Sequence, residues 1–109
     1  MININDFSKL DLRIGTILKA ELLDKAKKPA YFLEIDLGEI GIKESSAQIT
    51  DLYQPSDLVG KQIVAIVNLP PKKIAGITSE VLVLGANGKH QTVVLLEPQK
   101  NIPNGAKVG

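Results

Sequence analysis

The chain has 109 residues, enough for one globular domain, and its 44% hydrophobic content excludes an intrinsically disordered segment. Thirteen basic residues against twelve acidic ones leave a net charge of +1, which argues against any mechanism that needs a strongly positive molecule. The absence of cysteine excludes disulfides and thiolate metal sites and favours a cytoplasmic protein, and no apolar run is long enough to span a bilayer. We therefore expect a single domain over residues 1–109, without membrane insertion.

The basic residues are almost all lysine, since Arg13 is the only arginine. Lysine is a hydrated point charge, whereas arginine carries the planar fork that makes bidentate contacts to bases and phosphates. With no tryptophan and few other aromatic residues, platforms on which single-stranded bases stack are also scarce. This composition disfavours base-specific recognition of duplex DNA.

The N-terminal part of the chain predicts a helical turn and one long strand. Asn5 or Asp6 is placed to cap a turn over residues 7–10. Residues 12–22 alternate as in a half-buried strand, with one face made of Leu12, Ile14, Thr16, Leu18, Ala20 and Leu22. Gly15 in the middle of this strand indicates a bulge or sharp bend that lets a sheet curl into a barrel.

Two further strands follow a charged loop. The lysines of residues 24–29 (DKAKKP) are most simply a solvated tip, and phosphate contact is the less favoured interpretation. Residues 31–37 alternate as a second strand, residues 38–41 make a tight turn, and a third strand runs from residue 42 to about residue 47. Residues 49–58 carry weak helical signals around Pro55.

The C-terminal half predicts more short strands. The runs at residues 63–67 and 81–84 are apolar and rich in β-branched residues, and they enclose a polar insert that turns back at Pro70, Pro71 and Gly76. Another strand is predicted over residues 92–96, and residues 107–108 are expected to pair as a last short strand.

Short strands with turns between them and almost no helical periodicity predict an all-β fold. A five-stranded, partly open barrel fits the length and the single helical connection between the third and fourth strands. We expect several fully buried side chains among Leu33, Ile35, Ile63, Val67, Leu82 and Leu84. The runs 63–67, 81–84 and 93–96 are apolar on both faces, although an antiparallel strand usually keeps one face in water. Either the chain's own termini or a second subunit must cover the outer faces, and we favour the second subunit.

No motif assembles an active site. His90 is the only histidine and lies beside Gly88 in a predicted turn, where an exposed loop residue is the simplest interpretation. The sequence contains no HExxH helix, EF-hand loop, phosphate-binding glycine loop or GxSxG elbow. We therefore expect no enzyme, no catalytic residue, no metal site and no cofactor.

Polar residues instead gather at the predicted rim of the sheet. Glu80, next to Ser79, either accepts hydrogen bonds from a partner or pairs with Lys72 or Lys73 across the hairpin, where an exposed pair contributes little. Residues 45–48 form a small polar patch that is either strand-end polarity or a ligand contact. Clustered polar residues at strand ends are typical of a binding rim.

Several stretches make the chain resemble the tRNA-binding domain family. They are DLRIGTI at residues 11–17, LVGK at 58–61, VNLPPKKIAG at 67–76 and SEVLVL at 79–84. Within this family, KPAY at 28–31 and IKESSAQIT at 42–50 are most similar to the CsaA group of small stand-alone secretion chaperones. The resemblance covers nearly the whole chain.

The resemblance implies an oligonucleotide-binding (OB) barrel with short helical connections and N- and C-terminal extensions, assembled as a homodimer. It also implies two ligand classes, because relatives fused to aminoacyl-tRNA synthetases bind the folded corner of tRNA, whereas the CsaA group holds unfolded or exported polypeptides. The chain departs from the tRNA binders at Pro70 and Ala75, where these have basic residues, and at residues 81–82, where Val-Leu replaces Gly-Met. Each missing cation removes a potential phosphate contact.

Two functional hypotheses follow. The first is a dimeric, export-related chaperone that holds extended polypeptide in an apolar groove near the subunit boundary; its candidate binding residues are Phe32, Ser46, Gln48, Asn68, Ile74, Ser79 and Glu80. The alternative is a protein that recognises structured tRNA by shape. Its candidate phosphate contacts are Arg13, Lys43, Lys72 and Lys73.

Overall fold

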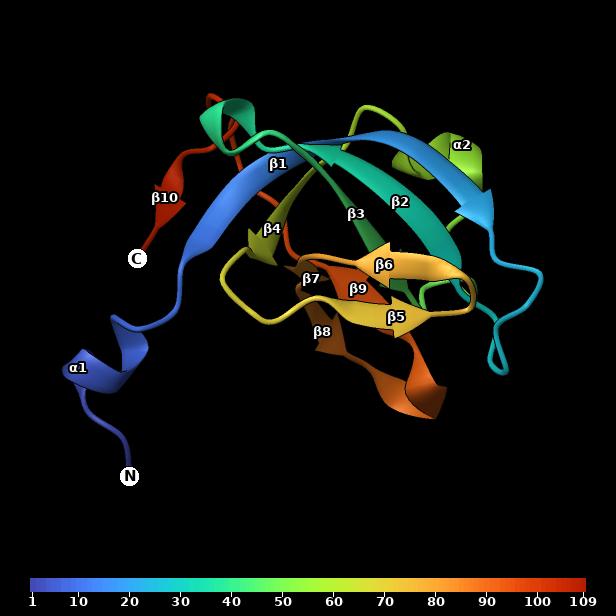
Figure 1. Ribbon diagram of the computed structural model, residues 1–109, viewed down its shortest axis with the longest axis horizontal. Coiled ribbons are helices and arrows are strands. Elements are labelled where there is room, and N and C mark those ends of the chain that lie inside the picture. Colours follow the sequence, from blue (N-terminus) through green and yellow to red (C-terminus); the bar gives the residue numbers. More distant parts are fainter.

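The computed structural model describes residues 1–109 and is built mainly of β-strands (Figure 1). Its main sheet consists of β1 (Leu12–Leu22), β2 (Tyr31–Asp36), β3 (Ile42–Ala47), β4 (Gln62–Ile66), β7 (Leu82–Val83) and β10 (Lys107–Val108). The strand order is β3-β2-β1-β4-β7, β10 pairs with the start of β1, and every pairing is antiparallel. The sheet curls into a nearly closed barrel, which confirms the predicted all-β, OB-like class.

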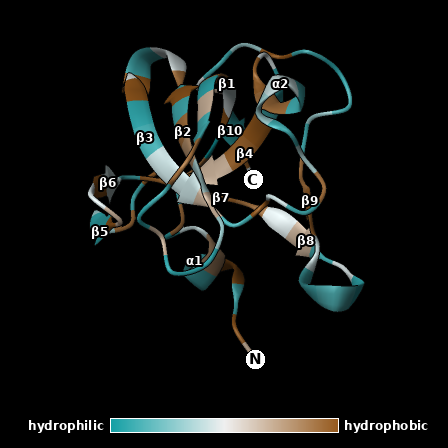
Figure 2. Ribbon diagram, turned by 90° about the vertical axis from the view of Figure 1, so that its right-hand side faces the viewer, coloured by the Kyte–Doolittle hydropathy of each residue, from teal (hydrophilic) through white to brown (hydrophobic).

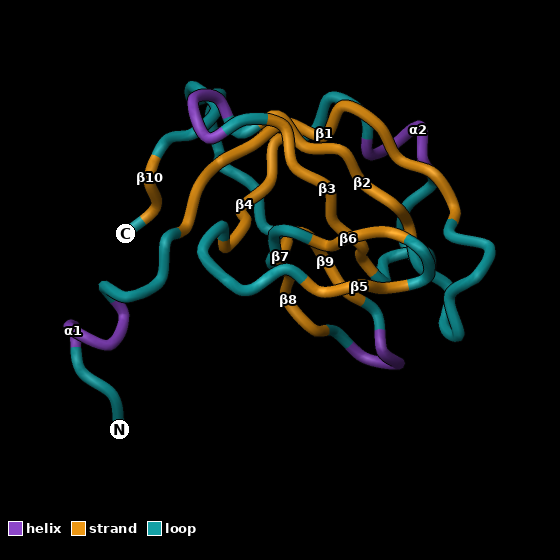
Figure 3. Tube along the Cα trace, in the orientation of Figure 1, coloured by secondary structure: helices purple, strands orange, loops and turns teal.

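Two small hairpins and a few helical turns complete the fold. β5 (Lys72–Ile74) pairs with β6 (Ile77–Ser79), and β8 (Gly85–Asn87) pairs with β9 (Val93–Leu95). The helical elements are short (Figure 3): α1 (Ile4–Phe7), α2 (Pro55–Leu58) and the 3-10 turns Gly38–Ile40 and Lys89–Gln91. α2 follows β3 in the chain, as predicted, and no helix has the length and hydrophobicity needed to cross a bilayer.

The N-terminal helical turn starts earlier than the sequence predicts. Asn3, rather than Asn5 or Asp6, is the N-cap of α1. The Asn3 side chain accepts a hydrogen bond from the Asp6 amide and the Asp6 carboxylate accepts one from the Asn3 amide, both at 3.1 Å. This reciprocal capping box satisfies two amides that would otherwise lack partners, so it fixes the start of α1.

A bulge in β1 changes which of its residues face the barrel interior. The register between β1 and β2 shifts between Ile17 and Lys19. Ile17 and Ala20, three positions apart, therefore both belong to the main core, whereas Leu12 and Ile14 belong to a second apolar cluster. The predicted single apolar face of residues 12–22 is wrong for this reason, and Leu18 and Leu22 are exposed.

Gly15 permits the tight packing of β1 against β2. A Cβ atom on Gly15 would lie 2.7 Å from side-chain atoms of both Ile35 and Leu37. The bulge predicted at Gly15 lies instead between Ile17 and Lys19, and Gly15 permits a close approach because no larger side chain fits against Ile35 and Leu37.

The barrel interior holds the main core. Leu33, Ile35 and Ile63 are fully buried there, as predicted, and Val67 is partly buried against it. Leu84 is partly buried in the second cluster instead, and Leu82 is 47% exposed, so Leu82 is not a core residue.

The second cluster lies on the outer face of β1 and β4 and is covered by the chain's own C-terminal segment. Its buried members are Leu12, Ile14, Val64 and Ile66, and Leu84, Ala106 and Val108 pack against them. Figure 2 shows the apolar residues of β4 in brown. Val64 and Ile66 are each only 9% exposed in the single chain, so the expectation that a second subunit buries them is wrong.

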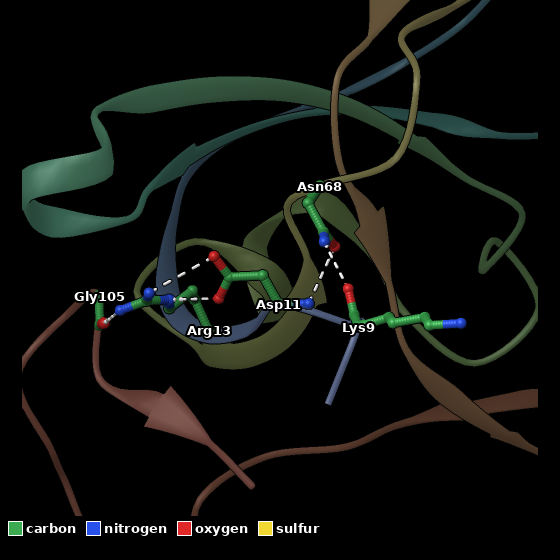
Figure 4. A network of polar contacts seen from close by, with 5 residues as sticks. All are labelled: Lys9, Asp11, Arg13, Asn68 and Gly105. Carbon is green, nitrogen blue, oxygen red and sulfur yellow. Dashed lines mark hydrogen bonds and ion pairs between the residues drawn. The ribbon is translucent and has the colours of Figure 1, made fainter. Parts of the chain in front are cut away.

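Polar contacts fix the C-terminal turn and the N-terminal segment at the two sides of β1 (Figure 4). Arg13 donates to an Asp11 carboxylate oxygen at 2.6 Å and to the Gly105 carbonyl at 3.0 Å. Asn68, which follows β4, donates to the Lys9 carbonyl at 2.7 Å and accepts from the Asp11 amide at 2.9 Å. Asn68 and Arg13 therefore connect segments that are far apart in sequence.

The hydrogen bond to Asp11 raises the pKa of the Arg13 guanidinium above its ordinary value. A raised pKa means that the stabilisation is complete below the unfolded-state pKa and is lost only as pH rises through the folded-state pKa. Both values lie in the strongly alkaline range, so this contact gives no pH dependence of stability near neutrality.

The fold predicts that truncating a buried apolar side chain lowers the free energy of unfolding much more than truncating an exposed one. Ile63→Ala removes a fully buried side chain from the main core, and we expect it to lower the free energy of unfolding by about 2–5 kcal/mol. The matched control Leu18→Ala, at the exposed bulge of β1, should cost less than about 1 kcal/mol. Urea denaturation measures the free energy of unfolding of both variants. Equal losses of stability would contradict the assignment of the core.

The contacts of Asn68 predict a structural role. Asn68→Ala removes two hydrogen bonds to the N-terminal segment, and we expect a loss of about 1–2 kcal/mol together with faster hydrogen exchange of the Asp11 amide. Asn101→Ala, an exposed asparagine without a side-chain hydrogen bond, is the control. Unchanged stability combined with impaired ligand binding would instead make Asn68 a ligand contact.

Candidate binding groove

Three adjoining cavities lie around the end of β3, the hairpin β5–β6 and β7. Ser46 and Ile74 line all three cavities, and Gln48 lines two of them. Because they share these residues, the cavities adjoin one another, and we call the three together the groove. Its two larger parts differ in chemistry.

The first part is apolar. Eight of its twelve lining residues are hydrophobic, and they come from β3, β5, β7 and β9: Ala47, Ile49, Ile74, Leu82, Val83, Leu84, Val93 and Leu95. Ile49 and Leu95 are buried, whereas Leu82 presents nearly half of its surface to solvent. This apolar groove offers a surface that gains free energy when a ligand removes it from water.

The second part is cationic, with a volume of about 660 Å³. Lys25, Lys27 and Lys28 come from the loop before β2, and Lys72 and Lys73 come from β5. No carboxylate lines this part, and none of its five lysines belongs to an ion pair, since the four ion pairs involve Lys9, Arg13, Lys19 and Lys61. This lysine cleft therefore attracts anions.

Ser79 and Glu80 attach the segment before β7 to the free edge of β3. A Glu80 carboxylate oxygen accepts from the Glu44 amide at 2.9 Å, and the Glu80 amide donates to the Glu44 carbonyl at 2.8 Å. The Ser79 hydroxyl accepts from the Ser46 amide at 3.3 Å. Glu80 forms no ion pair with Lys72 or Lys73, so its main contact is with the backbone of its own chain.

Buried Ser45 adds to the same attachment, since its hydroxyl donates to the Val81 carbonyl at 2.8 Å. The polar patch at residues 45–48 therefore divides: Ser45 is structural, while Ser46 and Gln48 line the groove.

The candidate polypeptide-binding residues fall into three groups. Ser46, Gln48 and Ile74 line both the apolar groove and the lysine cleft. Ser79 and Glu80 line the smallest cavity and brace β3. Phe32 and Asn68 do not line the groove: Phe32 is half-buried on β2, opposite Ser46 in register, and Asn68 holds the N-terminal segment.

Of the candidate phosphate contacts, the structure brings together only Lys72 and Lys73. Arg13 is engaged with Asp11 and Gly105, and Lys43 is half-buried on β3, opposite Ile35 in register. The cleft adds Lys25, Lys27 and Lys28, which the sequence analysis favoured as a solvated tip. The signal that identifies them is three lysines within four residues in a loop that precedes a strand.

Comparisons with known proteins agree over the whole chain. The family model of the tRNA binding domain matches residues 12–107. The crystal structure of the chaperone CsaA from Bacillus anthracis is 57% identical, covers 100% of this chain and 99% of that chain, and superposes with a TM-score of 0.95. The CsaA chaperone protein from Picrophilus torridus is 49% identical, with 100% of both chains covered and a TM-score of 0.93.

A methionine–tRNA ligase from Methanococcoides burtonii is 40% identical over 100 residues, which make up 92% of this chain and 14% of the ligase. The chain thus spans about a seventh of the length of such relatives. The match over residues 12–107 and the likeness to stand-alone CsaA chaperones show that this chain belongs to the tRNA-binding domain family.

Proposed function

We propose that this protein is a dimeric, non-catalytic binding module of the CsaA type that holds unfolded or exported polypeptides in the cytoplasm. The observation that carries the proposal is the apolar groove, in which hydrophobic side chains of four strands lie beside the polar groups of Ser46 and Gln48. The likeness of the whole chain to proteins named CsaA chaperones supports it.

The edge of β3 determines how such a polypeptide is held. The amides of Glu44 and Ser46 already have partners in Glu80 and Ser79, so a ligand strand has no free ladder along that part of β3. Binding therefore relies on burial of apolar side chains against Ile74, Val83 and Val93, with main-chain hydrogen bonds limited to the region of Gln48. Burial of this kind demands little of the ligand's sequence.

An apolar strip beside the second cluster supports assembly as a dimer. Leu82 pairs with Ile66 in register and so extends the outer face of β4. Leu82, Val94 and Leu96 are 47%, 48% and 42% exposed, and residues 106–108 do not cover them. A second copy of the chain would cover this strip through a two-fold interface and would place the groove near the subunit boundary.

The strip gives a test of assembly. We expect the protein to sediment as a dimer at micromolar concentration and Leu96→Glu to sediment as a monomer, because a charge would be buried without a partner. Leu18→Glu, at the exposed bulge of β1, should leave the dimer intact. Sedimentation of the unchanged protein as a monomer would contradict a dimer.

A second candidate function, binding of structured tRNA, is favoured by the lysine cleft and by the family. Five lysines without ion-pair partners are placed to meet phosphates from two sides, the loop before β2 and the strand β5. Lysine contacts of this kind recognise the shape of a folded RNA rather than its bases.

Salt dependence separates the two functions. Binding of an unstructured peptide without charged residues should change little between about 50 and 200 mM salt, whereas tRNA binding through these lysines should weaken with a log–log slope of roughly −3 to −5. Ile74→Glu should impair peptide binding, and Lys72→Gln with Lys73→Gln should flatten the salt dependence of tRNA binding. Fluorescence anisotropy measures both.

If tRNA binds tightly with an affinity that falls steeply as salt rises, and the uncharged peptide does not bind, tRNA binding becomes the first candidate function. If Ile74→Glu leaves peptide binding unchanged, the apolar groove is not the polypeptide site.

A further inference from the structure

We infer that the polypeptides held in the groove carry carboxylates next to their apolar segment, so that the lysine cleft binds the acidic part while the apolar groove binds the rest. This inference rests on the proposed polypeptide-binding function and specifies the class of polypeptide. The apolar groove and the lysine cleft adjoin, the five lysines have no ion-pair partners, and the strands beside the cleft carry carboxylates.

The two parts of the groove adjoin each other. Ser46, Gln48 and Ile74 line both the apolar groove and the lysine cleft. An extended chain advances about 3.3 Å per residue, so a ligand whose apolar side chains contact Ile74 enters the lysine cleft within a few residues. A ligand that fills the apolar groove is therefore exposed to the charge of the cleft.

The cleft carries positive charge that the chain itself does not neutralise. All five lysines are exposed and unpaired, and no aspartate or glutamate lines the cleft with them. Since the whole chain has a net charge of only +1, the remaining surface carries an excess of carboxylates. The positive potential is thus local, which suits a short anionic segment better than a long one.

Carboxylates on the strands beside the cleft also disfavour a long anionic ligand. Glu44 lies two residues before Ser46, a lining residue of the cleft, on the same face of β3, and Glu34 of β2 lies directly opposite Glu44 in register. These half-buried carboxylates repel a phosphate backbone, which carries a charge at every nucleotide. A polypeptide, in contrast, needs carboxylates only where it crosses the cleft. Charge complementarity therefore favours an acidic polypeptide segment over RNA.

The test uses three labelled synthetic peptides that share one apolar segment and differ in a flank of four Glu, four Gln or four Lys residues. We expect the full-length protein to bind them in that order by fluorescence anisotropy, with the Glu peptide about fivefold to thirtyfold tighter than the Gln peptide at low salt, because two or three exposed ion pairs contribute that much. The advantage should shrink at high salt.

Charge variants locate the effect. Lys27→Gln with Lys72→Gln and Lys73→Gln should remove the preference for the Glu peptide and leave binding of the Gln peptide unchanged. The matched control, Lys89→Gln with Lys100→Gln and Lys107→Gln, makes the same change of net charge at exposed positions outside the groove and should keep the preference. Circular dichroism verifies the fold of both variants.

The peptide titrations distinguish failure of this inference from failure of the polypeptide-binding function. Equal affinity for the three peptides overturns this inference and leaves the polypeptide-binding function standing, whereas no binding of any peptide overturns the function itself. A cleft variant that loses tRNA binding but keeps its preference for the Glu peptide shows that the lysines serve RNA alone, and it also overturns the inference.

Discussion

The attachment of residues 79–81 to the edge of β3 determines where this barrel is closed and where it is open. A strand edge leaves amides and carbonyls that need partners. Here the Glu80 carboxylate and the Ser79 hydroxyl supply them at Glu44 and Ser46, and Ser45 adds a buried bond to Val81. β3 and β7 therefore approach each other without forming a ladder, and the hairpin β5–β6 stands beside the gap (Figure 1). The groove is the space that this side-chain closure leaves.

The same closure brings two kinds of chemistry to one place. Because β5 is held beside the end of β3, its Ile74 lies over the apolar floor while Lys72 and Lys73 face the lysines of the loop before β2. The family has relatives named as chaperones and as methionine–tRNA ligases, and in this chain an apolar surface and a cationic one adjoin.

Local patterns identified much of the fold but few of the long-range contacts. The third strand has the predicted bounds, because its turn residues Gly38 and Gly41 mark its start. The bulge of β1 was predicted at Gly15 but lies between Ile17 and Lys19, since Leu18 looks like any other alternating residue until the register with β2 is known. The packing of Ala106 and Val108 against the second cluster joins segments that are far apart in sequence, so no local pattern reveals it. Polar side chains were the hardest to assign, because Asn68 and Glu80 look the same in sequence whether they bond to their own backbone or to a ligand.

The second apolar cluster has a consequence for how the chain acquires its structure. Arg13 reaches Gly105 across 92 residues, and Thr16 reaches Asn104 across 88. Contacts that close such long loops form late, and folds rich in them mature in milliseconds to seconds rather than microseconds. During synthesis, Leu12 and Ile14 lack their contacts with Val108 and Ala106 until residues 106–108 have left the ribosome. For that interval, a protein proposed here to hold unfolded chains is itself a chain with exposed apolar strands.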